Sequence, residues 1–212
     1  MYHNESVKIY NELSNQKESF KGQILFELGD IEIKINGKDG VGGLVEEWFG
    51  AWCEGKGFDI ESANKNSGSQ SFPDFFIEGD KLLEVKTFDA DASANFDLAN
   101  FDSYCKSVSE NPKRVDSDYL IFSYRMVDGN LSIQDIWLKK IWEITCPSER
   151  WPLKTQTKKD VIYNIRPAAW YSDKPRFKTF NSRDEFINAL FKTQQEYAGI
   201  SYLKDYQSNF FK

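Results

Sequence analysis

The chain has 212 residues, of which 40% are hydrophobic and 16% aromatic, and its formal net charge is −6. This composition supports a folded domain and excludes a disordered chain, a small disulfide scaffold and a generic basic DNA-coating protein. The apolar runs are far shorter than the roughly 20 residues that span a bilayer, and the polar N-terminus lacks the apolar region of a signal peptide. Three widely spaced cysteines, Cys53, Cys105 and Cys146, indicate reduced thiols in a cytoplasmic protein.

Histidine occurs once, as His3, near the start of the chain. A Ser-His-Asp triad, a Cys-His dyad, an H-E-x-x-H zinc site and an HNH-type nuclease all need a histidine inside the fold. Any chemistry must therefore depend on carboxylates, lysines, hydroxyls or thiols.

The first half of the chain alternates helical and strand patterns. Residues 5–20 are predicted to form a helix, and residues 24–35 a hairpin with a Gly-Asp turn. Apolar residues from 44 to 52 recur at helical spacing, so a helix is expected there, closed by Gly55 or Gly57. Strands are expected over residues 58–62, 74–78 and 82–88.

The second half continues with a helix and further strands. The patterns predict a helix over 94–108, strands over 119–126, 131–138 and 140–145, an irregular stretch over 147–181 and a helix over 183–197. Ser182 precedes the last helix and Glu185 follows three residues later, which is the spacing of a capping box. The order predicts an α/β (α+β) fold, a central mixed sheet flanked by helices, in one domain over residues 1–212.

Three charged residues in the middle of the chain form a candidate metal site. Glu84 and Lys86 are two apart on a predicted strand, so their side chains project to the same face, while Val85 points into the core. If 74–78 and 82–88 are neighbouring strands, Asp74 lies beside Glu84. Two carboxylates suit Mg²⁺, and Lys86 can orient a water and offset negative charge on a phosphate.

The spacing of these residues is loose enough to arise by chance, and Glu-x-Lys on a strand can also be a solvated ion pair. The context favours a site, because an otherwise apolar strand does not bury two charges without a reason. The preceding predicted helix adds a third acid. Glu46 borders its apolar stripe and can face the sheet, with Glu47 as the competing choice.

The order of these motifs resembles the PD-(D/E)XK nuclease superfamily over roughly residues 40–127. A helix carries Gly42-Gly43-Leu44-Val45-Glu46, and a strand follows; then come Pro73-Asp74 and Leu83-Glu84-Val85-Lys86. The resemblance implies a restriction-endonuclease-like core and metal-dependent phosphodiester hydrolysis. It makes Asp74 and Glu84 metal ligands, the Val85 carbonyl a further ligand, Lys86 the water-orienting lysine and Glu46 an auxiliary acid.

Within that superfamily the chain resembles type II restriction endonucleases. It has no G-x-x-x-x-G-K-[ST] loop, so no ATP-driven translocation is expected. The blocks DIWLKKIWEI, YNIRPAAWY and NFDLANFDSY resemble the NgoBV-like restriction endonucleases.

A basic segment is the candidate DNA-recognition region, within about residues 147–181. Residues 151–178 carry seven basic and two acidic side chains, a net +5 that leaves −11 for the rest of the chain. Such focused charge is typical of a phosphate-contacting segment, although a solvated, lysine-rich loop would look similar. Arg166 is the first choice for a guanine contact. The candidate set is Lys154, Gln156, Lys158, Lys159, Asn164, Arg166, Lys174 and Arg176.

Three functions remain open from the sequence. The first is a bacterial, Mg²⁺-dependent type II restriction endonuclease that acts on double-stranded DNA, as a homodimer because two copies match the dyad of a palindromic site. A cognate DNA methyltransferase is then expected as a genetic neighbour. The second is a repair or modification-dependent nuclease of the same superfamily. The third is a non-catalytic nucleic-acid-binding domain.

Overall fold

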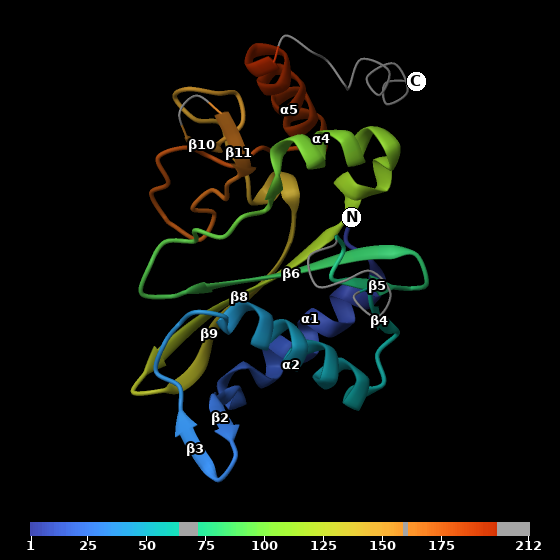
Figure 1. Ribbon diagram of the computed structural model, residues 1–212. Coiled ribbons are helices and arrows are strands. Elements are labelled where there is room, and N and C mark those ends of the chain that lie inside the picture. Colours follow the sequence, from blue (N-terminus) through green and yellow to red (C-terminus); the bar gives the residue numbers. More distant parts are fainter. Residues whose placement is uncertain (64–71, 159–160, 199–212) are drawn as a thin grey trace. The chain divides into compact units, whose positions relative to one another are not determined.

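The structure, a computed structural model, describes residues 1–63, 72–158 and 161–198 (Figure 1). The chain forms two compact units. The first contains Met1–Ser93 and Asp118–Lys139, and the second contains Ala94–Ser117 and the described residues from Lys140 onward. The predicted catalytic core, residues 40–127, therefore lies in the first unit apart from residues 94–117.

Among the described residues, two α-helices belong to the first unit. α1 spans Asn4–Gln16 and continues into a short 3-10 helix, η1, at Lys17–Ser19, while α2 spans Val41–Lys56. α2 ends at Gly57, whose φ of 73° is in the left-handed region that glycine tolerates best. Gly57, rather than Gly55, therefore closes the helix.

A six-stranded mixed sheet is the main element of the first unit. Its strand order is β1–β9–β8–β6–β5–β4. β6 and β8 run parallel, whereas β1 with β9, β4 with β5, and β5 with β6 are antiparallel. The strands are β1 Lys21–Gln23, β4 Ile60–Ser62, β5 Phe75–Ile77, β6 Lys81–Asp89, β8 Asp118–Val127 and β9 Asn130–Lys140. The predicted mixed sheet with helices is confirmed.

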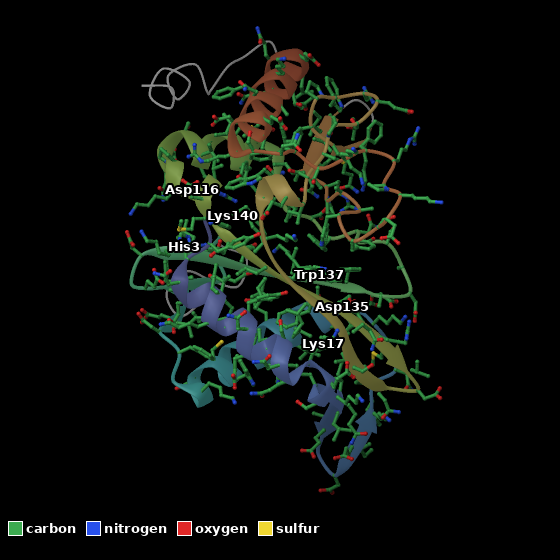
Figure 2. The ribbon with its side chains drawn as sticks, turned by 180° about the vertical axis from the view of Figure 1, so that it is seen from behind. His3, Lys17, Asp116, Asp135, Trp137 and Lys140 are labelled. Atoms are coloured by element: carbon green, nitrogen blue, oxygen red, sulfur yellow. The ribbon has the colours of Figure 1, made fainter. Side chains whose placement is uncertain are left out.

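One face of this sheet forms the core of the first unit. Leu83 and Val85 of β6 belong to a buried cluster with side chains of α1, α2, β5, β8 and β9. The ion pair between Lys17 and Asp135, at 2.8 Å, also ties η1 to β9 (Figure 2). Since side chains alternate along a strand, Glu84 and Lys86 project from the opposite face.

A separate two-stranded sheet also belongs to the first unit. Strands β2, Leu25–Leu28, and β3, Ile31–Lys34, pair antiparallel as the predicted hairpin. All of their residues are exposed except Lys34, which is half-buried.

In its described part, the second unit contains two α-helices and a three-stranded sheet of order β10–β11–β7. Its elements are β7 Ala99–Asn100, α4 Phe101–Glu110, η2 Pro112–Asp116, η3 Ile141–Glu143, β10 Thr155–Lys158, β11 Val161–Ile165 and α5 Arg183–Ala198. Among the helices of the described ranges, none is long and apolar enough to cross a membrane.

Three expectations for the second unit change in the structure. The predicted helix over 94–108 begins only at Phe101, because the Asn100 side chain caps it by accepting from the Ser103 N–H at 3.0 Å. The predicted strand over 140–145 was wrong, since the chain turns there through η3. The irregular stretch over 147–181 also contains the β10–β11 hairpin.

The start of α5 follows the predicted cap in part. The Ser182 hydroxyl accepts from the Glu185 N–H at 3.2 Å. The Glu185 carboxylate, however, accepts from the N–H of Asn181 at 2.8 Å, one residue before the expected donor.

Candidate active site

The β5–β6 pairing brings the two predicted ligand carboxylates together. Phe75 pairs with Leu83 in an antiparallel register, so Asp74, one residue before the strand, lies beside Glu84. The carboxylate of Asp74 accepts a hydrogen bond from the N–H of Val85 at 2.8 Å. The neighbouring strands assumed from the sequence are therefore present, and they fix Asp74 against the middle of β6.

Glu84 and Lys86 form an ion pair on the face of β6 that points away from the core. The ammonium of Lys86 donates to Glu84 Oε1 at 2.6 Å, and the two side chains are only 20% and 7% exposed, respectively. The alternative of a solvated surface pair does not fit this burial. An apolar pair would be less costly in folding free energy at this buried position, so the presence of two charges here indicates a role other than stability.

The charges of the site act strongly on one another. Burial raises the pKa of Asp74, while the nearby Lys86 and the Val85 N–H partly oppose that rise. Burial by itself would lower the pKa of Lys86, but the carboxylates of Glu84, Asp74 and Glu46 hold it above its usual value. Lys86 is therefore an ammonium at neutral pH and supplies positive charge rather than a proton-accepting amine.

The structure separates Glu46 from its competitor Glu47. Both lie on α2, which packs against β6. Glu46 is half-buried and its charge contributes to the raised pKa of Lys86, whereas Glu47 is exposed. Glu46 is accordingly the third acid whose field reaches the site.

The donor set fits a hard cation that keeps several waters. No three acidic, histidine or cysteine side chains among the described residues form a ready metal cluster, so a closed protein cage is absent from that part of the chain. The carboxylates of Asp74 and Glu84 could hold such a cation, and the burial that raises the pKa of Asp74 marks a place where a cation would stabilise negative charge. Mg²⁺ prefers sites with few protein carboxylates, in which water and phosphate oxygens complete its coordination shell.

The backbone of Val85 is placed to contribute as well. Its N–H points toward Asp74. The N–H and C=O of one strand residue lie on the same side of the strand, so the Val85 carbonyl also faces the side of β6 on which Asp74 lies.

The predicted DNA-binding residues belong to the second unit. Gln156 and Asn164 face each other across β10 and β11, where the Asn164 amide donates to Gln156 Oε1 at 3.2 Å. Lys158 is exposed at the end of β10, with its ammonium 5.8 Å from the centre of the Tyr163 ring. These three side chains therefore lie on a single hairpin. Lys159 lies outside the described residues.

Arg166, the first choice for a base contact, is already engaged within the second unit. Its guanidinium donates to Asp97 and to Asn95, and its side chain is only 16% exposed. A contact with guanine would have to replace these partners. This pairing could not be predicted from local pattern, because Asp97 lies 69 positions before Arg166.

The remaining predicted cations differ in exposure. Lys154 donates to the Pro167 carbonyl at 2.7 Å, while Lys174 is exposed. Arg176 is also exposed and pairs with Glu149. A cavity of about 490 Å³ is lined by Lys154, Arg176 and a residue that sequence reasoning missed, Arg150. The basic segment considered in the sequence began at residue 151, one position after Arg150. The guanidinium of Arg150 lies over the ring of Trp151, 5.2 Å from its centre.

Known proteins resemble this chain both in sequence and in fold. The family model of the NgoBV restriction endonuclease matches residues 3–207. The type II restriction enzyme NlaIV of Neisseria lactamica is 38% identical over 194 residues, which cover 88% of this chain and 79% of that enzyme. The type II restriction enzyme NgoBV of Neisseria gonorrhoeae is 35% identical over 161 residues, which cover 72% of this chain and 89% of that enzyme.

A solved structure of the NlaIV restriction endonuclease matches the fold with a TM-score of 0.85 at 34% identity. The match covers 98% of this chain and 90% of that structure. Fold and sequence thus agree over nearly the whole length. The chain therefore belongs to the NgoBV restriction endonuclease family, and the type II restriction endonuclease class predicted from its motifs is confirmed.

Proposed function

We propose that this protein hydrolyses both strands of double-stranded DNA at a specific sequence, with Mg²⁺ held by Asp74, Glu84 and the carbonyl of Val85. The observation that carries the proposal is the juxtaposition of Asp74 with the buried Glu84–Lys86 pair on β6. Membership in a restriction endonuclease family supports the DNA substrate. Divalent metal use is general in type II restriction enzymes, and the oxygen donors present here favour Mg²⁺.

Each residue of the site has a separate proposed role in hydrolysis. A Mg²⁺ ion held by these residues would polarise the phosphodiester and make water a better nucleophile at neutral pH. Lys86 carries a positive charge at neutral pH, so it can orient the attacking water and offset the negative charge that develops on the phosphate. Glu84 holds the Lys86 ammonium in place at 2.6 Å, and Glu46 adds negative charge that keeps Lys86 protonated.

Recognition of DNA is assigned to the second unit. Lys158, Lys174 and Arg176 are its exposed candidates among the predicted residues, and they suit phosphate contacts. Gln156 and Asn164 carry amides that can pair with base edges. Lys154, Lys159 and Arg166 remain candidates on the sequence argument given above.

The assembly and the genetic setting follow from the activity. Cleavage of both strands at a palindromic site is most simply done by a homodimer whose two sites share the dyad of the DNA. An active enzyme of this kind would cut its host, so a DNA methyltransferase gene should lie beside this one. A neighbourhood without such a gene would favour a modification-dependent or repair nuclease.

The test compares two Asp→Asn variants of the first unit. In Asp74→Asn the side-chain oxygen can still accept from the Val85 N–H, but the negative charge is lost. Asp91→Asn is the matched control, since Asp91 is half-exposed and pairs with Arg125 at the surface. We expect discrete, Mg²⁺-dependent DNA fragments from the wild type and from Asp91→Asn, and a loss of at least about 100-fold for Asp74→Asn.

Other outcomes would change the proposal. Equal cleavage by Asp74→Asn and the wild type would show that the site is placed wrongly. Nicking or smearing without discrete fragments would favour the repair reading. A folded protein that cuts neither methylated nor unmethylated DNA would favour a non-catalytic domain.

A further inference from the structure

Two glycines of α2 lie one helical turn before and one helical turn after Glu46. Gly42, Glu46 and Gly50 are spaced four residues apart, so they share one flank of the helix. The buried stripe of α2 consists of the residue that precedes each of them and of Cys53. This flank of α2 therefore runs directly beside the stripe that packs against the sheet.

Both glycines approach the sheet so closely that a larger residue would have to displace a neighbour. A Cβ atom added at Gly42 would lie 3.2 Å from Oγ1 of Thr87 on β6, and one added at Gly50 would lie 3.2 Å from Cε1 of Phe75 on β5. Cβ atoms seldom come this close to other side chains. Neither neighbour moves easily, because the β-branched Thr87 has few side-chain conformations and Phe75 is buried. A side chain at either position would therefore hold α2 away from the sheet.

The two close contacts involve strand residues next to the proposed site. Thr87 directly follows Lys86, and Phe75 directly follows Asp74. Glu46 lies between the two contacts along α2, and its charge acts on Lys86. The interaction between two charges weakens as their distance grows, and Glu46 moves with its helix. The separation between α2 and the sheet therefore sets how strongly Glu46 acts on the site.

We propose that Gly42 and Gly50 are positioning residues for DNA cleavage. By letting α2 lie close to β5 and β6, they hold the Glu46 carboxylate at the distance from which it acts on the site. Neither glycine is a catalytic residue, because each acts through Glu46. The inference rests on the proposed function, in which Glu46 is an auxiliary acid, and it adds the backbone feature that places this acid.

The first test compares two pairs of Gly→Ala substitutions in α2. The crowded pair is Gly42→Ala with Gly50→Ala. The open pair, Gly43→Ala with Gly55→Ala, is the matched control, since a Cβ atom at either position meets no atom within 4 Å. On a linear plasmid that the wild type cuts once, at saturating enzyme and Mg²⁺, the crowded pair should cleave about 10-fold more slowly, while the open pair stays within about twofold of the wild type. DNA affinity without divalent metal should be unchanged in both pairs, and equal cleavage by both would overturn the proposal.

The second test asks whether the two glycines act through Glu46. The crowded pair is combined with Glu46→Gln, which keeps the size of the side chain but removes its charge. Changes that act through one group are not additive. The combined variant should therefore cleave within about twofold of Glu46→Gln alone. A further loss as large as the one that the crowded pair causes in the wild type would show another route of action and would overturn the proposal.

The third test restores the space that Gly42→Ala fills. Thr87→Ala removes the Oγ1 atom that a Cβ atom at position 42 would meet. In the Thr87→Ala background, Gly42→Ala should therefore slow cleavage by less than about twofold. In the Thr87→Val background, which keeps the shape of the side chain, the loss caused by Gly42→Ala should persist. Equal losses in the two backgrounds would overturn the role of the close contact.

Thermal stability measures the close approach without any cleavage. Alanine is favoured over glycine inside a helix, so the open pair should melt about 2–4 °C above the wild type, while the crowded pair should gain less. Equal gains would overturn the close approach. If Glu46→Gln cleaves like the wild type, the role of Glu46 in the proposed function fails, and the inference fails with it. If Glu46→Gln is slow but the crowded pair is fully active, only the positioning by the glycines fails.

Discussion

Truncation of Phe49 should destabilise the first unit strongly and weaken the active site with it. Phe49 on α2 has no exposed surface, and its ring meets Phe75 edge-on at 5.3 Å and Phe122 at 6.1 Å between ring centres. Phe75 directly follows Asp74, so this cluster supports one of the proposed ligands. Phe49→Ala would leave a cavity between α2 and the sheet.

The expected loss in the free energy of unfolding is about 3–5 kcal/mol for Phe49→Ala. The two ring contacts account for about 0.5–1.5 kcal/mol each within that loss. For a chain of this size, each kcal/mol shifts the melting temperature by about 2–4 °C, so the variant should melt at least about 6 °C below the wild type.

Urea unfolding followed by circular dichroism provides the measurement, with Val161→Ala as the exposed control. The control should change the unfolding free energy by no more than about 0.5 kcal/mol. A loss below about 1 kcal/mol for Phe49→Ala would refute the reasoning, because it would mean that the ring is not packed in a closed core. Phe49→Leu should fall between the two and retain more cleavage activity than Phe49→Ala.

Three further predictions follow from the site and from the core. Glu46→Gln should slow cleavage by about 10–100-fold, the range for residues that act on a metal site indirectly. The Glu47→Gln variant, changed at an exposed position, should cleave like the wild type. A larger loss of cleavage for Glu47→Gln than for Glu46→Gln would exchange their roles. Mg²⁺ at 100 times its dissociation constant should stabilise the protein by about 2.7 kcal/mol, reversibly with EDTA, in a thermal melt; no shift would argue against metal binding. Burial raises the pKa of Cys53 and of Cys105 to about 12, so both thiols should resist alkylation at pH 8.5 until urea is added. Because the unfolded thiols lose their protons first, the free energy of unfolding should fall as the pH rises from about 9 toward 12; unchanged stability over that window would contradict the burial of these thiols.

The sequence determined the local arrangement of the proposed site. Alternation along a strand is a fixed property of extended backbone, so the shared direction of Glu84 and Lys86 could be derived without a structure. The tight turn between β5 and β6 then left little choice of register, and Asp74 lies beside Glu84 as expected. Local sequence signals also predicted that α2 ends at a glycine and that Ser182 caps α5.

Local pattern was insufficient where two structures suit the same residues. The segment 140–145 is apolar enough for a strand, but the chain turns there through η3, where the Lys140 N–H donates to the Glu143 carboxylate at 2.7 Å. Short apolar runs cannot distinguish strand from turn by periodicity. The sequence favoured Glu46, which borders the apolar stripe of α2, but it left Glu47 as a competing choice, and the burial of Glu46 in the folded chain separates the two.

Contacts between distant residues were decided only by the tertiary structure. Asp97 pairs with Arg166 across 69 positions, and no pattern in the sequence around Arg166 predicts that partner. The hairpin over 24–35 has the sequence pattern of a strand pair with one buried face, yet the apolar side chains of β2 and β3 are exposed on the folded unit. A sequence specifies which side chains share a face because backbone geometry is local, whereas what covers that face depends on how distant segments pack, and the packing exists only in the folded chain.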